Sequence, residues 1–280
     1  MRIKMLFLWL LCFFTTSVFA WGSVGHRLVA QIAYDQLTPQ AKKQIDALTD
    51  VMFHSRYPDA RFARASTWPD TIRQQAPQYS PWHFISLPIV KDNVTPPALE
   101  NNNNVVWAIA RAEKIVSDPS ENNARRAKYL SFLVHFIGDI HQPLHCATLY
   151  DHQFLHGDRG GNDFPIASSV SNNLHWFWDE GVGLFASNPG QYQFHYYEIQ
   201  TMANQWMKDY PRAYFTKQLQ EQSPMQWAKD SHHIANTVVY QIQPNTKPSQ
   251  TYIQNGQTIV REQVVLAGYR LADVLNRIFG

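Results

Sequence analysis

The motif H-x-x-x-D, which is typical of metal ligands, occurs twice in the chain, at His135/Asp139 and at His175/Asp179. Residues four apart lie on one face of a helix, so each pair presents an imidazole and a carboxylate to the same point. His145 lies between the two pairs, within the segment HQPLH. Imidazole nitrogen and carboxylate oxygen are ligands that zinc accepts, and catalytic zinc sites keep one position for water. The pattern therefore predicts a zinc site.

Additional donors of the same kind precede these motifs. Asp70 follows Trp-Pro, His83 stands between Trp82 and Phe84, and His26 lies further upstream. A single H-x-x-x-D arises readily by chance on a solvated helix face. Here, however, His135 is surrounded by apolar residues and His175 by tryptophans, where polar groups need partners. The donor set is large enough for several zinc ions.

The first 20 residues have the pattern of a signal peptide. Arg2 and Lys4 precede an apolar run, and Ala20 closes a segment of small residues that a signal peptidase reads. The run is short for a membrane span. We expect cleavage after Ala20, which would leave Trp21 as a free N-terminus. A free α-amine and the carbonyl of the same residue can chelate a metal whatever the side chain.

Composition limits the kinds of partner. The chain has 24 Lys plus Arg and 22 Asp plus Glu, and loss of residues 1–20 removes two basic and no acidic residues, so the remaining charge is zero with His neutral. No basic field therefore attracts duplex nucleic acid.

Of two cysteines only Cys146 remains, so no internal disulfide forms; it is either a soft ligand or a small buried residue. No stable protein partner is implied, and we expect an exported monomer without a membrane anchor.

Helical periodicity dominates residues 21–280, and alternating strand patterns are scarce. We expect a helix from Val24 to Ile32, one that Thr38 and Pro39 open, and a helix over 61–73 that Pro69 breaks. Further helices are expected at about 97–118, 123–141, 171–184, 192–210, 224–242 and 260–279. Residues 77–97, 146–170 and 244–258 have the composition of loops, and Asn101–Asn104 that of a solvated helix face. These patterns indicate one all-α domain.

The order of the motifs resembles that of the zinc-dependent single-strand nucleases, which include the fungal single-strand-specific nucleases and the plant bifunctional nucleases. More distantly it is similar to bacterial zinc phospholipase C. The motifs are W-x-x-x-x-H, WPD-x-x-R, WHF, HFIGD-I-HQPLH, GDRGGND and NLHWFWD, between Trp21 and about Gly183. The resemblance implies a single compact helical domain of that type, spanning residues 21–280, with three zinc ions at the bottom of a cleft.

The resemblance also implies which residues bind each zinc ion. Each expected position carries a donor of the right type. The implied ligands are Asp70, His83, His135 and Asp139 for one zinc; the Trp21 amine and carbonyl, His26 and the bridging Asp139 for a second; and His145, His175 and Asp179 for a third.

The function implied is an endonuclease that hydrolyses single-stranded DNA or RNA to 5′-phosphorylated products, with 3′-nucleotidase activity. Two zinc ions bridged by Asp139 would activate a water, whose pKa falls to about 7. The third would bind a phosphate oxygen and stabilise the departing 3′ oxygen. Arg73 would bind the phosphate, so Asp70, Arg73 and Asp139 are the candidate catalytic residues.

Base recognition is less determined by the sequence. Phe84 could stack on an unpaired base or belong to the core. Ser86 stands where the fungal nucleases have an Asp that reads the base edge, so the base preference stays open. Asn162 could touch substrate or brace its glycine-rich loop, Asp163 is expected to be structural, and His141 is expected to support the ligands or the packing.

Three alternative functions remain. A phospholipase C-like phosphodiesterase would close the third zinc site with H-x-x-x-E, whereas this chain has Asp179. A non-catalytic zinc protein would favour Cys ligands, which are absent here. A nucleic-acid-binding module without chemistry fits poorly with zero net charge. The sequence leaves several properties open. They are the preference for DNA or RNA, the activity on duplex, the pH optimum, the biological role, and whether the protein stays in the periplasm or enters the medium.

Overall fold

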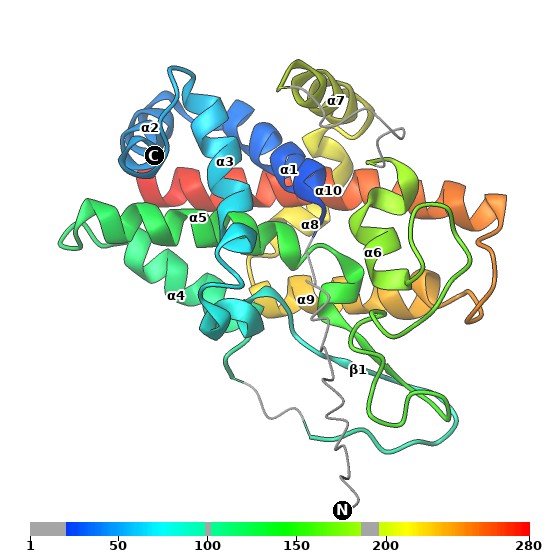
Figure 1. Ribbon diagram of the computed structural model, residues 1–280. Coiled ribbons are helices and arrows are strands. Elements are labelled where there is room, and N and C mark those ends of the chain that lie inside the picture. Colours follow the sequence, from blue (N-terminus) through cyan, green and yellow to red (C-terminus); the bar gives the residue numbers. More distant parts are fainter. Residues whose placement is uncertain (1–20, 99–101, 186–195) are drawn as a thin grey trace, which may run out of the picture.

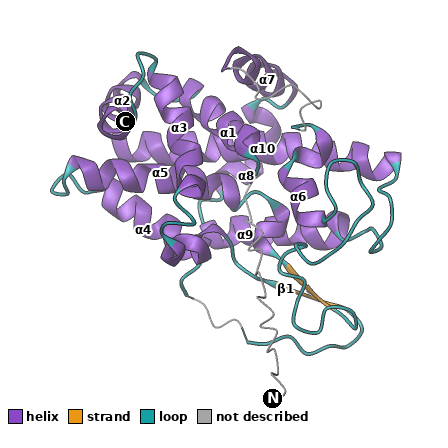
Figure 2. Cartoon of the chain, viewed as in Figure 1, coloured by secondary structure: helices purple, strands orange, loops and turns teal. Residues whose placement is uncertain are grey.

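The computed structural model describes residues 21–98, 102–185 and 196–280, so the expected signal peptide lies outside the described residues. Helices make up most of the described chain (Figures 1 and 2). They are α1 (Ser23–Asp35), α2 (Pro39–Met52), α3 (Pro58–Thr71), α4 (Val105–Ser117), α5 (Asn123–Asp139), α6 (Leu174–Asp179), α7 (Tyr196–Asp209), α8 (Thr216–Gln220), α9 (Pro224–Ile234) and α10 (Gln250–Phe279). Five short segments of tighter or wider helix are η1 (Pro77–His83), η2 (Pro143–Cys146), η3 (Gly181–Gly183), η4 (Arg212–Phe215) and η5 (Ala235–Val239). The predicted all-α class is confirmed.

The core forms where α10 crosses the other helices. This helix runs the width of the molecule and packs against α1, α2, α4, α5 and α7 (Figure 1). The close crossing with α1 depends on Gly268, because a Cβ there would lie 2.5 Å from Ile32 Cγ2. Helix α5 lies between α3 and α4 and is buried along its second half, where His135 and Asp139 occur. Within the described ranges, no helix has both the length and the apolar character that a membrane span requires.

Local sequence signals set several helix starts as expected. Thr38 accepts a hydrogen bond from the Ala41 amide ahead of Pro39, and Asn122 accepts one from the Arg125 amide. Both are side-chain caps, which satisfy amides that have no partner within the first helical turn. Helix α4 begins only at Val105, because Asn104 caps it, and Asn103 accepts a hydrogen bond from the Trp82 indole. The predicted start near 97 and the helical-face interpretation of Asn103 and Asn104 were therefore wrong; residues 99–101 lie outside the described residues.

Three other boundaries differ from the prediction. Helix α3 continues for two residues beyond Pro69. Proline has no amide hydrogen, so one backbone hydrogen bond is missing, but it is missing in the last turn, where the helix ends anyway. Helix α6 ends at Asp179, because Gly181 and Val182 adopt left-handed φ angles of 61° and 55°. Helix α9 passes into the π-helical turn η5. The expected start of α7 near 192 lies outside the described residues, and the helix is described from Tyr196 onward.

Helix α10 begins ten residues earlier than expected, at Gln250, where Ser249 caps it. The polar residues 250–258 had the composition of a loop. Gly256 is buried in this stretch, and a Cβ there would lie 3.1 Å from Val182 Cγ2 and 3.5 Å from the Trp178 ring. Because Gly256 has no side chain, Val182 and Trp178 can pack closely against the helix backbone. Such a contact leaves no apolar periodicity in the sequence.

Two short strands occur within segments expected to be loops. Strand β1 (Pro88–Val90) pairs in parallel with β2 (Thr148–Tyr150), with Ile89 opposite Leu149. Just before them, the Ile85 amide donates to the His145 carbonyl at 2.8 Å. This pairing holds the chain that follows His83 beside the chain that follows His145, and so brings two distant parts of the sequence to one site.

Candidate metal centre and adjoining cavity

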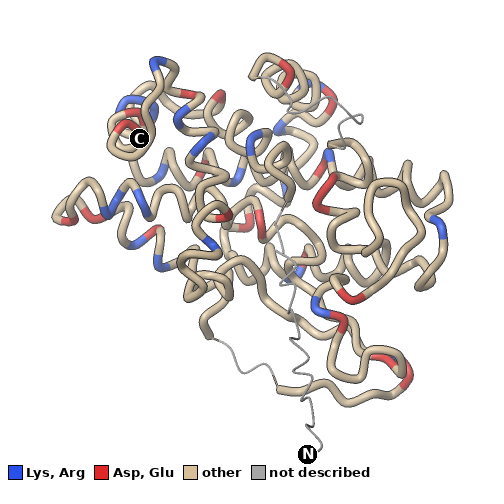
Figure 3. Tube along the Cα trace, viewed as in Figure 1, with Lys and Arg blue, Asp and Glu red and all other residues tan. Residues whose placement is uncertain are grey.

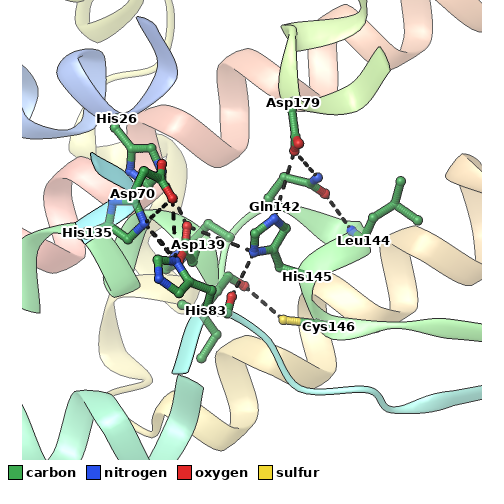
Figure 4. Close-up of polar contacts among 12 residues, drawn as sticks. His26, Asp70, His83, His135, Asp139, Gln142, Leu144, His145, Cys146 and Asp179 are labelled. Carbon is green, nitrogen blue, oxygen red and sulfur yellow. Dashed lines mark hydrogen bonds and ion pairs between the residues drawn. The ribbon is translucent and has the colours of Figure 1, made fainter. Parts of the chain in front are cut away.

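The predicted ligand side chains converge from six elements, α1, α3, η1, α5, η2 and α6. Three groups of His and Asp side chains place their donor atoms within 4.8 Å of one another: His26, Asp70 and His135; His83, His135 and Asp139; and His145, His175 and Asp179. Figure 4 shows the first two groups together, with His145 and Asp179 of the third group beyond Asp139. The structure therefore brings together every side chain predicted to bind zinc.

Asp139 is at the centre of the constellation. Its Oδ2 lies 3.0 Å from His83 Nδ1 and 3.2 Å from His135 Nε2, and its Oδ1 lies 3.3 Å from His26 Nε2. The two oxygens of one carboxylate thus face different imidazoles. Asp70 completes this half, with its Oδ1 3.6 Å from His135 Nε2. This geometry suits the bridging role expected of Asp139.

The third group lies on the other side of the same space. His175 Nε2 is 3.4 Å from Asp179 Oδ2, and His145 Nε2 is 3.9 Å from Asp179 Oδ1. The three side chains come from η2 and α6, which are brought together by the close approach of the intervening loop to Leu144. Gly160 makes that approach possible, because a Cβ there would lie 2.6 Å from the Leu144 carbonyl oxygen.

Backbone carbonyls orient three of the imidazoles. The Nδ1 of His135 donates to the Ser66 carbonyl at 2.7 Å, that of His145 to the His83 carbonyl at 2.7 Å, and that of His175 to the Gly160 carbonyl at 2.6 Å. Such a hydrogen bond fixes the tautomer, so the Nε2 lone pair is directed at the shared space. Neutral imidazoles held in this way are suited to binding a cation.

Burial makes the charged form of every one of these groups unfavourable. Desolvation raises the pKa of Asp70 and of Asp139 to about 6 and that of Asp179 well above its usual value. The same cause lowers the pKa of His26 to about 4. Within the described part of the chain, the buried atoms without a hydrogen-bond partner include Asp70 Oδ1, Asp139 Oδ1, His145 Nε2 and Asp179 Oδ2. A bound cation would balance the buried carboxylates and take these atoms as ligands, so the residues fit a metal.

Trp21 lies beside this centre. Its side chain is fully buried, and the neighbouring Gly22 amide donates to the Asp179 carbonyl at 2.8 Å. Gly138 allows the close packing here, because a Cβ on it would lie 2.8 Å from His26 Nδ1 and 4.0 Å from Trp21 Cδ1. Trp21 and His26 therefore lie against the residue that precedes Asp139, where the sequence predicts their zinc.

A cavity of about 220 Å³ adjoins the third group. His145 and His175 form part of its wall, together with Arg73, Phe84 and Asn162. Phe84 is 37% exposed, so the prediction that it is available to a ligand is favoured over a role in the core. Arg73 Nη1 is buried without a hydrogen-bond partner, and desolvation lowers the pKa of its guanidinium. The cavity thus presents an aromatic face and a cation next to the metal ligands.

Asn162 and Asp163 differ in their surroundings. Asn162 lines the cavity and also donates through Nδ2 to the Arg159 carbonyl at 2.8 Å, so it braces its loop while its Oδ1 remains available. Asp163 is exposed and pairs with Arg159 at 3.4 Å, and its structural role stays a prediction. His141 is remote from the ligand groups, because its Nδ1 donates to the Ile137 carbonyl and its Nε2 accepts from Arg270 at 2.8 Å.

Cys146 and the tryptophans have structural surroundings. The Cys146 thiol is buried, donates to the Ile140 carbonyl at 3.3 Å and has its pKa raised by desolvation, so the soft-ligand alternative is not supported. Trp82 and Trp178 are buried. Trp82 packs against Phe136, whose ring also contacts His83. Trp82 and Phe136 thus form an apolar wall beside His83.

The sequence analysis missed two residues that position the site. Gln142, within HQPLH, donates to Asp179 Oδ1 at 2.6 Å and accepts from the Leu144 amide at 2.6 Å. Asp158 is fully buried and accepts from the Leu149 amide at 2.9 Å and from the Tyr240 hydroxyl at 2.7 Å. It anchors the loop that carries Gly160, the carbonyl partner of His175. Gln142 lies in HQPLH and Asp158 in GDRGGND, and neither has a spacing that would have indicated its role.

Comparisons with known proteins agree with this geometry. The model of the S1/P1 nuclease family matches residues 21–280. Endonuclease 4 of Arabidopsis thaliana is 28% identical, over 92% of this chain and 89% of the relative. Nuclease S1 of Aspergillus oryzae is 28% identical over 93% and 92%, and nuclease P1 of Penicillium citrinum is 27% identical over 93% and 98%. With its ligand set and its full-length match, the chain belongs to the S1/P1 nuclease family.

Proposed function

We propose that the protein is a zinc-dependent endonuclease that hydrolyses single-stranded DNA or RNA to 5′-phosphorylated products and removes the phosphate of 3′-nucleotides. The observation that carries this proposal is the cavity in which Phe84 and Arg73 adjoin His145 and His175. A phosphate with an attached base matches that arrangement, since its anion requires a cation and its base an aromatic face.

We assign three zinc ions to the centre. Asp70, His83, His135 and Asp139 would hold the first, and His145, His175 and Asp179 the third. The second would take His26, Asp139 and the amine and carbonyl of Trp21. Zinc in such sites supplies a nucleophile at neutral pH and stabilises negative charge on phosphate oxygens. The buried carboxylates and the oriented imidazoles of the chain would determine where the zinc ions lie.

Arg73 is the residue of this chain that would bind the phosphate. Its guanidinium is a planar fork of donors that matches phosphate oxygens, and a partly desolvated fork interacts more strongly than an exposed one. Phe84 would stack on the attached base. Stacking contributes about 1–3 kcal/mol per base and requires an unpaired base, which favours single strands over duplex.

The charge distribution also favours this substrate class. Lys and Arg are interspersed with Asp and Glu along the described chain (Figure 3). With residues 1–20 removed, the net charge is zero with His neutral, which disfavours the binding of duplex through its phosphates. We further propose that the protein is exported after removal of residues 1–20, to the periplasm or the medium. Cleavage there would release the α-amine of Trp21, which the second zinc site needs.

A substrate panel tests this function. The chain beginning at Trp21 is loaded with zinc and assayed on single-stranded DNA, single-stranded RNA, a duplex, a 3′-nucleotide and a short-chain phosphatidylcholine, each with and without chelator. We expect chelator-sensitive cleavage of the single strands with 5′-phosphate ends, and phosphate release from the 3′-nucleotide. Cleavage of the lipid alone would instead assign a phospholipase C-like activity, and intact substrates throughout would assign a structural role to the metal.

A further inference from the structure

The cavity beside the third metal group is rich in hydrogen-bond donors. Its wall among the described residues contains no Asp or Glu. The polar groups offered are the Ser86 and Thr148 hydroxyls, the Asn162 amide and two guanidinium groups, those of Arg73 and Arg159. Its volume of about 220 Å³ is below the roughly 300 Å³ at which drug-sized pockets begin, which suits a single base.

Arg159 is held at the rim of this cavity by a constrained backbone. Its φ angle is 56°, in the left-handed region, and it stands between Asp158 and Gly160. The buried Asp158 carboxylate ties this loop to the Leu149 amide and to Tyr240, and the Gly160 carbonyl accepts from His175 Nδ1 at 2.6 Å. The position of Arg159 relative to the metal ligands is therefore fixed by two buried hydrogen-bonding groups.

The side chain of Arg159 is available for a ligand. It is 60% exposed and forms an ion pair at 3.4 Å with Asp163, whose side chain is 47% exposed. Ion pairs between exposed side chains are weak and are readily exchanged for another acceptor. Arg73, by contrast, is half-buried near Asp70 and Asp139, where a phosphate is its expected partner. Arg159 is thus the guanidinium that can reach a base edge.

We propose that Arg159 selects the base held in this cavity. It would favour bases with an oxygen at purine C6 or pyrimidine C4, guanine above all, over adenine and cytosine, which have an amino group there. The proposal rests on the nuclease function proposed above. A guanidinium donates two parallel hydrogen bonds to guanine O6 and N7, and one to the O4 of thymine or uracil. Adenine and cytosine present an amino donor at the corresponding position, and no carboxylate in the described wall accepts it.

Cleavage of dinucleotides tests this selection. The zinc-loaded protein is given the full set of deoxydinucleotides, so that each base is varied on either side of the phosphate, and kcat/KM is measured for each. We expect guanine at one of the two positions to exceed adenine by roughly 10-fold, at the lower end for a bidentate pair because the site is partly solvated. In Arg159→Ala the ratio falls toward one, and Arg159→Lys retains only part of it, because an ammonium lacks the fork.

Two further variants sharpen the test. Asp163→Ala releases the guanidinium from its ion pair and should raise the guanine preference. Arg125→Ala is the matched control, because Arg125 also pairs with a carboxylate four residues away, Glu121, and does not line the cavity. It should leave the ratio unchanged.

The outcomes separate the two proposals. Cleavage of all dinucleotides at similar rates, or a guanine preference that survives Arg159→Ala, overturns the role of Arg159 and leaves the nuclease function standing. If no dinucleotide is cleaved, the single-strand and 3′-nucleotide assays above decide whether the nuclease function fails. In that case calorimetric titration with guanosine 5′-monophosphate and adenosine 5′-monophosphate decides the base selection, and equal affinities overturn it.

Discussion

Replacing Asp139 by Asn is expected to lower phosphodiester cleavage by more than about 100-fold and to reduce the zinc content. Mutation of a residue that only orients a metal ligand lowers metal affinity or activity by about 10- to 100-fold. Mutation of a central ligand should therefore lower them further. Asp139 lies within 3.3 Å of three imidazoles, and its two oxygens face different ones. No other carboxylate of the centre contacts all three, so none can replace it.

The fold should survive this change. Burial raises the pKa of Asp139 to about 6, so its ionised form destabilises the metal-free protein at neutral pH, and a neutral Asn removes that cost. We expect an unchanged helical circular dichroism spectrum and a metal-free melting temperature no lower than that of the wild type. Asp273→Asn is the matched control, since Asp273 pairs with Arg212 away from the centre, and it should keep full activity. Normal cleavage by the Asp139 variant would contradict the shared-carboxylate geometry.

Replacing Arg73 by Ala is expected to lower kcat by about 100- to 1,000-fold, which is the range for removal of one preorganised donor to a developing charge. Arg73 Nη1 is buried in the cavity wall without a hydrogen-bond partner, so it has a donor to offer a phosphate oxygen. The zinc content should stay unchanged, because Arg73 is not a ligand. Single-turnover kinetics and a zinc assay on the same preparation measure both quantities.

Two further variants test the role of the guanidinium fork. Arg73→Lys should recover part of the rate, since the charge remains without the planar pair of donors. Arg64→Ala changes an exposed Arg of helix α3, which ends at Thr71, two residues before Arg73. The Arg64 guanidinium stacks on Phe53, so this variant should leave kcat at the wild-type value. An Arg73→Ala enzyme with reduced zinc and unchanged turnover per zinc would show that Arg73 supports the metal centre and does not act on the phosphate.

The ligand side chains could be predicted because helix geometry converts spacing into position. Residues four apart on α5 and on α6 place His135 beside Asp139 and His175 beside Asp179, whatever the rest of the fold does. The order of motifs then identified the remaining donors, and the structure places His26, Asp70, His83 and His145 among them.

The residues that orient the ligands could not be predicted in the same way. Gln142 and Asp158 act through hydrogen bonds to Asp179 and to the loop at Gly160, and these bonds depend on how distant segments meet. The same limit explains α10, whose first turns pack through Gly256, and the pairing of β1 with β2. Contacts made by backbone or by a missing side chain have no periodic pattern in the sequence.

The zinc content of the chain that begins at Trp21 tests the account most directly. Metal analysis of the purified protein should give about three zinc ions per chain, falling by about one when a Met precedes Trp21, because the extra residue converts the α-amine into an amide. Three zinc ions with this selective loss would agree with the proposed ligand sets. One or no zinc in the chain beginning at Trp21, or an unchanged content in the extended chain, would contradict them.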